Sequence, residues 1–154
     1  MKFSDFIRED SLCVPLSSLE GHFAIHEMVW ALDVHGHIPR DASNDVIASV
    51  LKREELGNTG IGRGVAVPHA HHACVKRSVG TIGNHPTGIQ FSSLDGEPVR
   101  LFFLLISPPD RPGDHLRALE FTSKALRQDD LMQRLKDAES PWEAIDLLKE
   151  FDAW

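Results

Sequence analysis

Basic residues, cysteines and long hydrophobic runs are all scarce in this 154-residue sequence. Lysine and arginine together number 16 against 23 aspartates and glutamates, which gives a formal net charge of −7. Because proteins bind nucleic-acid backbones chiefly through clustered basic side chains, this balance argues against a nucleic-acid partner.

The longest apolar run, Leu101–Ile106, is far shorter than the roughly 20 residues that a membrane-spanning helix needs. The N-terminal stretch Met1–Asp10 carries too many charges for a secretory signal. We therefore expect no membrane segment and a cytoplasmic protein.

The only two cysteines, Cys13 and Cys74, form no Cys-x-x-Cys pair. A chain of this length builds a core without disulfides, so we expect both thiols to be reduced and packed. Residues 1–154 contain no repeat, low-complexity tract or proline-rich linker, which predicts a single domain.

Apolar side chains recur at helical spacing over residues 18–35 and again from Ser43 to Leu56, which predicts one helix over each range. Asp41 or Ser43 is suited to begin the second helix. Gly57 is suited to end it in the left-handed conformation.

The middle of the chain predicts strands. Val65–Val67 is a short strand ended by Pro68, and 79–82 and 88–91 are short strands of low hydrophobicity. The continuous apolar run 99–106 is typical of a central strand that is covered on both faces.

The final third predicts helices. Asp114 is expected to cap a helix over 116–126, and Asp129 one over 131–136. Ser140–Glu143 combines an N-cap, a proline at the first helical position and a capping glutamate. Helices therefore precede and follow the strands, which predicts an α/β fold: a mixed β-sheet flanked by helices on both faces.

The glycine-rich segment Gly57–Gly64 leads into the strand that delivers His69. It is not a Walker A loop, because Arg63 and Gly64 stand where lysine and serine or threonine are required. Nucleotide binding is therefore not indicated, and no other cofactor is.

A zinc site is a second interpretation of this region. His69, His71, His72 and Cys74 offer suitable ligands, and residues two apart in an extended segment share a face. The sequence contains no second ligand pair at matching spacing, so we predict no metal.

A third interpretation makes His69 a phosphoryl acceptor. A neutral imidazole is nucleophilic near pH 7, and backbone amides of a glycine loop or a helix N-terminus can hold phosphoryl oxygens. Against this stands a plain structural histidine at the end of a strand.

The string Thr59-Gly60-Ile61-Gly62-x-Gly64-Val65-Ala66-Val67-Pro68-His69 resembles the active-site signature of one bacterial family. These are the enzyme IIA domains of the mannitol/fructose class of the phosphoenolpyruvate:sugar phosphotransferase system. Arg53-Glu54 before the string and His115-Leu116, followed by Leu119, resemble further family positions. The resemblance spans nearly the whole chain and implies that family's sandwich fold.

The resemblance implies that His69 is phosphorylated by a histidine-containing phosphocarrier, HPr or its nitrogen-branch relative. It also implies that His115 is a second active-site histidine, which hydrogen-bonds the phosphoryl group, and that Arg53 lies beside it. With Asp114 as N-cap, the backbone amide of Leu116 would lie at the positive end of a helix dipole.

Two neighbours of the signature have open roles. Asn58 and Thr59 either offer an amide and a hydroxyl to phosphoryl oxygens or shape the turn, and we favour the turn. The sequence departs from the family after Pro68-His69, where Ala70 stands in place of a common glycine. His71 and His72 either tune His69, assist a phosphoryl oxygen or face solvent, and we favour solvent.

Members of this family either feed phosphate to the IIB domain of a sugar permease or, in the nitrogen-regulatory type, bind target proteins in one phosphorylation state. The signature occurs in both types. A chain without an attached IIB or membrane segment resembles the regulatory type more, and we expect a regulatory phosphohistidine carrier. The alternatives are a IIA component of a fructose/mannitol-type permease and a binding module of the same fold that is not phosphorylated.

Overall fold

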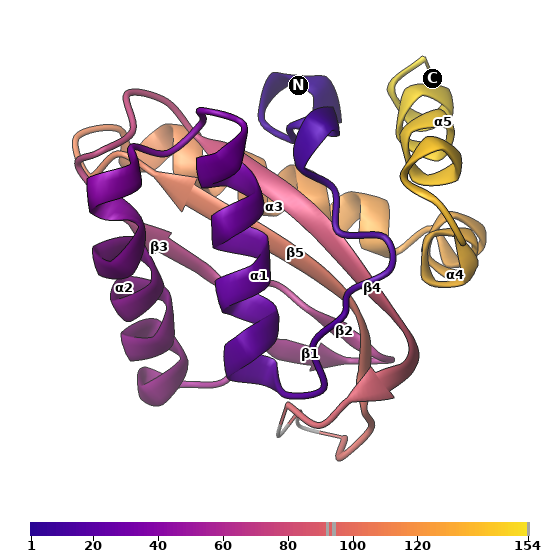
Figure 1. Ribbon diagram of the computed structural model, residues 1–154. Helices are drawn as coiled ribbons and strands as arrows, with labels where there is room; N and C mark the ends of the chain where they lie inside the picture. Colours follow the sequence, from indigo (N-terminus) through magenta and orange to yellow (C-terminus); the bar gives the residue numbers. More distant parts are fainter. Residues whose placement is uncertain (92, 94, 154) are drawn as a thin grey trace.

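The computed structural model describes residues 1–91, 93 and 95–153 of the chain. Short 3-10 helices, α-helices and strands follow one another along it (Figure 1). In chain order they are η1 (Phe3–Asp5), η2 (Glu9–Ser11), α1 (Gly21–Val34), η3 (Arg40–Ala42), α2 (Ser43–Leu56), β1 (Gly60–Gly62), β2 (Val65–Ala66), β3 (His69–His71), β4 (Val79–Ile89), β5 (Val99–Ser107), α3 (Pro112–Leu126), α4 (Asp129–Asp137) and α5 (Pro141–Asp152).

Strand β5 is the centre of a mixed sheet. It pairs antiparallel with β4 along one edge, and parallel with β2 and then β3 along the other. Val65 lies opposite Leu101, and His69 lies opposite Leu105. Strands β2 and β3 thus pair with the same side of β5 and are separated by Val67 and Pro68, and β1 pairs with the outer side of β2. The predictions of a central strand here and of a strand end at Pro68 are confirmed.

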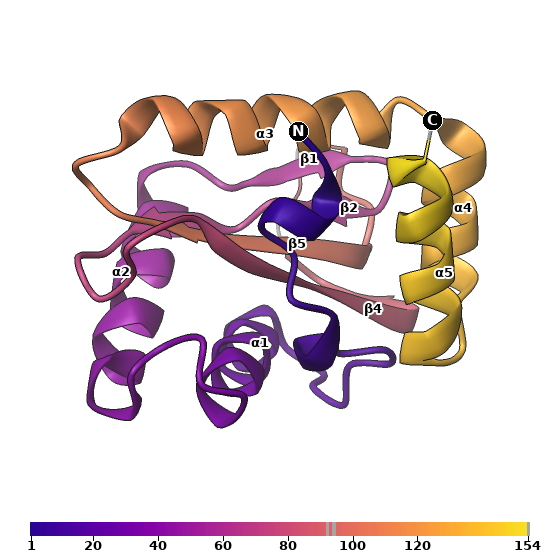
Figure 2. The ribbon, with the colours of Figure 1, turned by 90° about the horizontal axis from the view of Figure 1, so that it is seen from above.

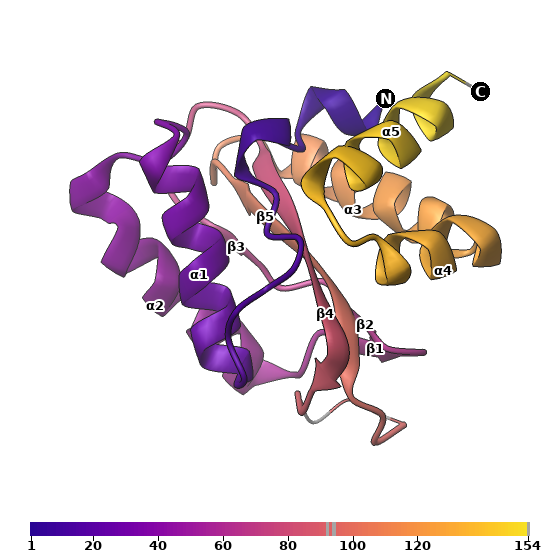
Figure 3. The same ribbon diagram turned by 45° about the vertical axis from the view of Figure 1, so that its right-hand side comes forward.

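Helices cover both faces of this sheet. Helices α1 and α2 lie on one side, and α3, α4 and α5 lie on the other (Figures 2 and 3). Successive side chains of β5 alternate between two cores: Phe102 and Leu104 pack with α1 and α2, whereas Leu101 and Phe103 pack with the C-terminal helices. The continuous apolar run in the sequence follows from burial on both faces, and the predicted fold class is confirmed.

Strand β4 corrects the prediction of two short strands over 79–82 and 88–91. It is one strand of eleven residues, with a register shift between Asn84 and Ile89. The pairing with β5 holds the weakly hydrophobic middle in place, and the buried amide of Asn84 donates to the carbonyls of Leu135 and Ala138 at 3.0 and 2.8 Å. Hydrophobic patterning does not report such tertiary hydrogen bonds, so the sequence divided the strand.

Gly57 ends α2 as predicted, but three details of the predicted helix ends are wrong. Gly57 follows α2 with φ 169°, which is extended and not left-handed backbone. Asp114 is the third residue of α3, behind the N-cap Arg111, and Asp129 is the first residue of α4. The predicted cap at Ser140 is confirmed, because its hydroxyl accepts the Glu143 amide at 3.3 Å.

The two cysteines are free thiols, as expected. Burial and the nearby Glu27 carboxylate raise the pKa of the Cys13 thiol to about 12, so this residue is an inert core group. Cys74 is half-buried. Within the described residues, no helix is long and apolar enough to cross a membrane.

Candidate functional site

His69 lies at the start of β3, directly after the proline that separates β3 from β2. Its Nδ1 is 2.7 Å from the carbonyl oxygen of Val67. A carbonyl oxygen only accepts hydrogen bonds, so in the neutral ring the proton lies on Nδ1 and donates to Val67. The lone pair of Nε2 is then free, which is the state that a nucleophile requires.

The pKa of His69 is lowered from its ordinary value, chiefly because the ring is partly buried. The positive charge of Arg53 and the neighbouring His71 lower it further, whereas the Val67 carbonyl and the Glu54 carboxylate oppose the shift. His69 is therefore predominantly neutral at pH 7.

His115, from the first turn of α3, lies across from His69, with 5.4 Å between the ring centroids. It is buried. Its Nδ1 is 2.6 Å from the Ser107 hydroxyl at the end of β5. Burial, together with His71 and His69, lowers the pKa of His115 to about 4, so this ring is neutral as well. The structure thus brings together the two histidines that the sequence predicted for one site.

His71 belongs to the same group of rings. It follows His69 by two residues in β3 and shares its face, and its ring centroid is 4.2 Å from that of His115. His71 is an exposed residue, so its ring contacts solvent as well as the site. His72 is turned elsewhere, because its Nδ1 accepts the backbone amide of Cys74 at 3.0 Å.

Arg53 lies in the last turn of α2, where the sequence placed it. One of its guanidinium nitrogens donates to the carbonyl of Gly57 at 2.6 Å. This bond fixes the side chain beside the histidines, and the remaining N–H groups stay available to an anion.

These residues line a cavity of about 410 Å³, which we call the histidine cavity. Apolar side chains complete its rim: Leu56 is 81% exposed and Leu116 is 59% exposed. The residues that line it are Ser49, Lys52, Arg53, Leu56, His69, Ala70, His71, His115, Leu116 and Leu119.

Asn58 and Thr59 lie outside this lining. The Asn58 amide donates to the carbonyl of Phe91, and the Thr59 hydroxyl donates to the carboxylate of Glu54. Both side chains therefore hold the loop after α2 in place, in agreement with the turn-shaping alternative.

The glycine-rich segment forms the β1–β2 hairpin instead of a cradle beside His69. Arg63 and Gly64 at its tip both have positive φ, 59° and 77°, which suits a tight two-residue turn. Among the described residues that line the histidine cavity, none comes from 57–64.

The start of α3 also differs from the expectation. Because Asp114 is the third helical residue, the Leu116 amide lies beyond the first four N–H groups that a helix leaves free. The Asp114 carboxylate pairs with Arg111 and Arg117. Leu116 thus borders the cavity through its exposed side chain, and His115 reaches it through its ring.

Sequence analysis missed Ser107 and Ser78. The Ser107 hydroxyl, bonded to His115, is also 2.8 Å from the Ser78 hydroxyl. A polar residue at the end of a buried central strand was the available signal. In the part of the chain that the structure describes, no group of three His, Cys, Asp or Glu side chains could hold a metal ion, so the zinc interpretation gains no support.

Comparison with known proteins relates this site to a family. The fructose-specific EIIABC component of the phosphotransferase system from Bacillus subtilis (strain 168) is 33% identical over 153 residues, which are 99% of this chain and 24% of that protein. The chain thus spans about a quarter of the length of that relative. The nitrogen regulatory protein of Klebsiella oxytoca is 36% identical over 110 residues, 71% of this chain and 68% of that protein.

Solved structures agree. The crystal structure of the nitrogen regulatory protein IIA-Ntr from Neisseria meningitidis matches with a TM-score of 0.83 and 27% identity, over 95% of this chain and 98% of that chain. IIA mannitol from Escherichia coli shares the fold, with a TM-score of 0.76 and 20% identity over 92% and 98% of the two chains. Residues 21–151 match the family described as phosphoenolpyruvate-dependent sugar phosphotransferase system, EIIA 2, and the chain belongs to this family.

Proposed function

We propose that this protein is a phosphohistidine carrier that accepts a phosphoryl group on Nε2 of His69 from an HPr-like phosphocarrier. One observation carries the proposal. A neutral imidazole, with its proton held on Nδ1 by the Val67 carbonyl, lies at an open cavity opposite a second neutral imidazole, that of His115.

The transfer is a displacement between two imidazoles. The Nε2 lone pair of His69 forms a bond to phosphorus as the N–P bond to the donor imidazole breaks, and the donor leaves as a neutral ring. The Nδ1 proton stays on His69, whose ring becomes positive. The Val67 carbonyl, 2.7 Å away, stabilises that charge.

Arg53 and His115 would hold the transferred group. A phosphoryl group carries about −1.5 to −2 charges at neutral pH, and the Arg53 guanidinium supplies an opposite charge beside it. His115 is neutral before the transfer, because its pKa is lowered to about 4, so its ring can donate one hydrogen bond to the arriving group without adding a second cation at the outset. The group is thus held but remains transferable.

The apolar rim suits a protein donor. Leu56 and Leu116 stand exposed at opposite elements, α2 and α3, around the cavity. Exposed apolar residues around a polar centre are typical of a protein docking surface. In a solved complex from Escherichia coli, an enzyme IIA of this fold is bound to phosphorylated enzyme IIB. An HPr-like carrier and a IIB domain or regulatory target would dock here in turn.

The regulatory, nitrogen-type role is the variant that we favour. The structural match to IIA-Ntr covers nearly all of both chains, and several curated relatives are nitrogen regulatory proteins at 36–38% identity. The charge gained on His69 would change the docking surface and with it the choice of target. We also infer that residues 1–154 act as one domain, since the Phe3 amide donates to Asp152 at 2.7 Å and joins both ends of the chain.

A sugar-transport role is the second candidate. The observation that favours it is the 33% identity to a fructose-specific component across 99% of this chain. In that case phospho-His69 would pass its group to a IIB domain.

The first experiment is phosphorylation of the full chain with phosphoenolpyruvate, enzyme I and a phosphocarrier, read by intact mass. We expect an acid-labile gain of one phosphate that is lost in His69→Ala. His72→Ala is the matched control, because this neighbouring histidine does not line the cavity. Failure to gain phosphate from any phosphocarrier would leave the non-phosphorylated binding module in its place.

A second experiment separates the two roles. Phosphorylated protein is mixed with the IIB domain of a fructose-type permease, and the phosphate on each partner is measured. Rapid transfer to IIB would establish the transport role. Retention on His69, with a target protein captured in only one phosphorylation state, would establish the regulatory one.

A further inference from the structure

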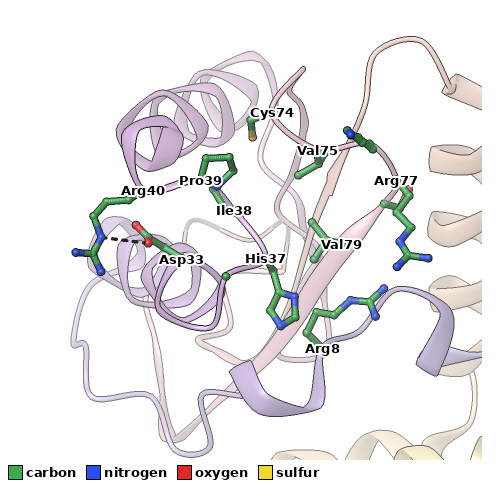
Figure 4. A pocket seen from close by; sticks show the side chains of 13 residues that line it. Arg8, Asp33, His37, Ile38, Pro39, Arg40, Cys74, Val75, Arg77 and Val79 are labelled. Carbon is green, nitrogen blue, oxygen red and sulfur yellow. Dashed lines mark ion pairs between the residues drawn. The ribbon is translucent and has the colours of Figure 1, made fainter.

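A larger cavity lies away from the proposed phosphorylation site. It has a volume of about 650 Å³ and opens between the turn from α1 to α2 and the segment that joins β3 to β4 (Figure 4). Buried side chains of Ile38, Val75 and Val79 contribute to its lining. This size and this apolar lining suit the body of a small organic molecule.

Positive charge gathers at this cavity, which we call the arginine cavity. Arg8, Lys76 and Arg77 line it, and none of the three forms an ion pair with another described residue. Figure 4 shows the guanidinium groups of Arg8 and Arg77 close together on one side, with the His37 ring beside Arg8. Burial and the charge of Arg77 lower the pKa of Arg8, against the opposing effect of Asp10 and Asp5.

The one carboxylate in the lining is already engaged. Asp33 accepts the Ser43 hydroxyl at 2.6 Å and pairs with Arg40 at 3.7 Å. The guanidiniums of Arg8 and Arg77 repel each other, and the nearby carboxylates of Asp10 and Asp5 offset this only in part. The Arg8 guanidinium donates to the backbone carbonyl of Asp5 at 2.9 Å, whereas Asp10 pairs with His37. An oxyanion would relieve this repulsion and accept several N–H bonds.

The arginine cavity is connected to the histidine cavity by two hydroxyls. Ser78 lines the arginine cavity, and its Oγ is 2.8 Å from the Oγ of Ser107. The same Ser107 oxygen is 2.6 Å from Nδ1 of His115, and Ser107 is fully buried.

The hydrogen-bonded series Ser78–Ser107–His115 has two proton arrangements. Each hydroxyl has one hydrogen, so the bonds run either from Ser78 through Ser107 to His115, or in the reverse direction. In the first arrangement Nδ1 of His115 accepts, and the ring proton lies on Nε2. In the second arrangement Nδ1 donates to Ser107, Ser107 donates to Ser78, and Nε2 of His115 has no proton.

We propose that the arginine cavity binds a small organic oxyanion, a carboxylate or a phosphate ester, and that Ser78 and Ser107 transmit this binding to the tautomer of His115. An anion that accepts the Ser78 hydrogen selects the second arrangement. His115 then offers no N–H through Nε2. The last step rests on the proposed function. The bound ligand opposes phosphorylation of His69, and phosphorylation lowers the affinity for the ligand by the same factor.

The test is a nuclear magnetic resonance titration of the full chain with ¹⁵N-labelled histidine and arginine. The probes are succinate, glycerol 3-phosphate and inorganic phosphate, with glycerol as the neutral control. We expect one of the organic anions to bind saturably and to move the His115 nitrogen shifts toward the Nδ1–H tautomer. The comparison of succinate with glycerol 3-phosphate shows which oxyanion is preferred. Equal binding of all three anions would contradict the proposal of a specific site for an organic oxyanion.

Variants separate the cavity from its coupling. Arg8→Gln/Arg77→Gln should weaken binding at least tenfold, whereas Arg134→Gln on the remote helix α4 should not. Ser78→Ala should still bind the anion through the arginines, more weakly by the one lost hydrogen bond, and the bound anion should no longer move the His115 shifts. Ser78→Thr, which keeps a hydroxyl, should restore that movement. Wild-type affinity in the double arginine variant, or a movement of the His115 shifts in Ser78→Ala as large as in the wild type, would overturn the proposal.

None of these readouts requires phosphoryl transfer. If His69 fails to accept phosphate while the titration succeeds, only the proposed function falls. If phosphorylation succeeds but no anion binds, or binding leaves His115 unmoved, only this inference falls. If both tests succeed, the anion should slow phosphorylation of the wild-type protein but not of the Ser78→Ala variant.

Discussion

The histidine cavity and the arginine cavity have opposite electrostatics although two hydroxyls connect them. In the histidine cavity, burial lowers the pKa values of His69 and His115, so the rings are neutral. In the arginine cavity, guanidinium groups keep their charge even where burial acts against it. A group that must attack phosphorus needs a free lone pair, whereas a group that only holds an anion needs a permanent charge.

The largest expected effect comes from removal of the His115 ring from the histidine cavity. His115→Ala should slow phosphorylation of His69 by about 10²–10³-fold, because a positioned donor to the transferred group is lost. Stopped-flow or rapid-quench measurement with a phosphocarrier would show it. An unaltered rate in a variant with native circular dichroism would mean that His115 does not touch the phosphoryl group.

Acid should destabilise the protein through the same ring. The pKa of His115 is about 4 in the folded protein and about 6.5 when unfolded. Between these values the unfolded chain binds the proton and the folded chain does not, so stability is lost as the pH falls from about 6.5 to 4, by up to about 3 kcal/mol. Stability is fully present above pH 6.5.

Urea unfolding at pH 7 and at pH 4.5 checks this prediction. Wild type and His115→Gln share every other titrating group, so the difference between their two pH responses isolates His115. Equal losses of unfolding free energy in both proteins would contradict a depressed pKa at this position.

The histidine cavity also differs from the arginine cavity in its exposed apolar rim, which suits a protein partner. Leu56→Ser/Leu116→Ser should raise the KM for the phosphocarrier about tenfold and leave kcat nearly unchanged. Steady-state kinetics measures both parameters. Leu19→Ser is the control, because Leu19 is 80% exposed and lies outside this cavity. A matching rise in KM for the control would show that the rim has no special role.

The smallest effect concerns a cation that belongs to the histidine cavity. Arg53 lowers the pKa of His69, so Arg53→Gln should raise that pKa and shift the acid limb of the phosphorylation profile to higher pH. We expect the ratio of rates at pH 6 and pH 8 to fall about two- to threefold relative to wild type. Rates across pH 5.5–8.5 would test it, and a shift toward lower pH would contradict the assigned cause.

Local sequence was sufficient for the parts of the molecule that local physics controls. The strand predicted over 99–106, the break at Pro68 and the cap at Ser140 depend on residues close in the chain, and the structure contains all three. Arg53 before the loop, His69 after the proline and His115 in the later helix were also found from the sequence. The family resemblance identified Arg53 and His115, whereas the chemistry of the glycine-rich segment and the resemblance both pointed to His69.

Only the tertiary structure decided what surrounds these residues. The pairing of β3 with β5 places His71 opposite Ser107, and the start of α3 then sets His115 against both. The same packing turned the glycine segment into a hairpin and set Arg8 beside Arg77, residues far apart in the chain. Sequence determined most of the elements and the candidate site residues, because these follow from local propensity and residue type. Tertiary packing determined tautomer, pKa and cavity, because each depends on neighbours from distant segments.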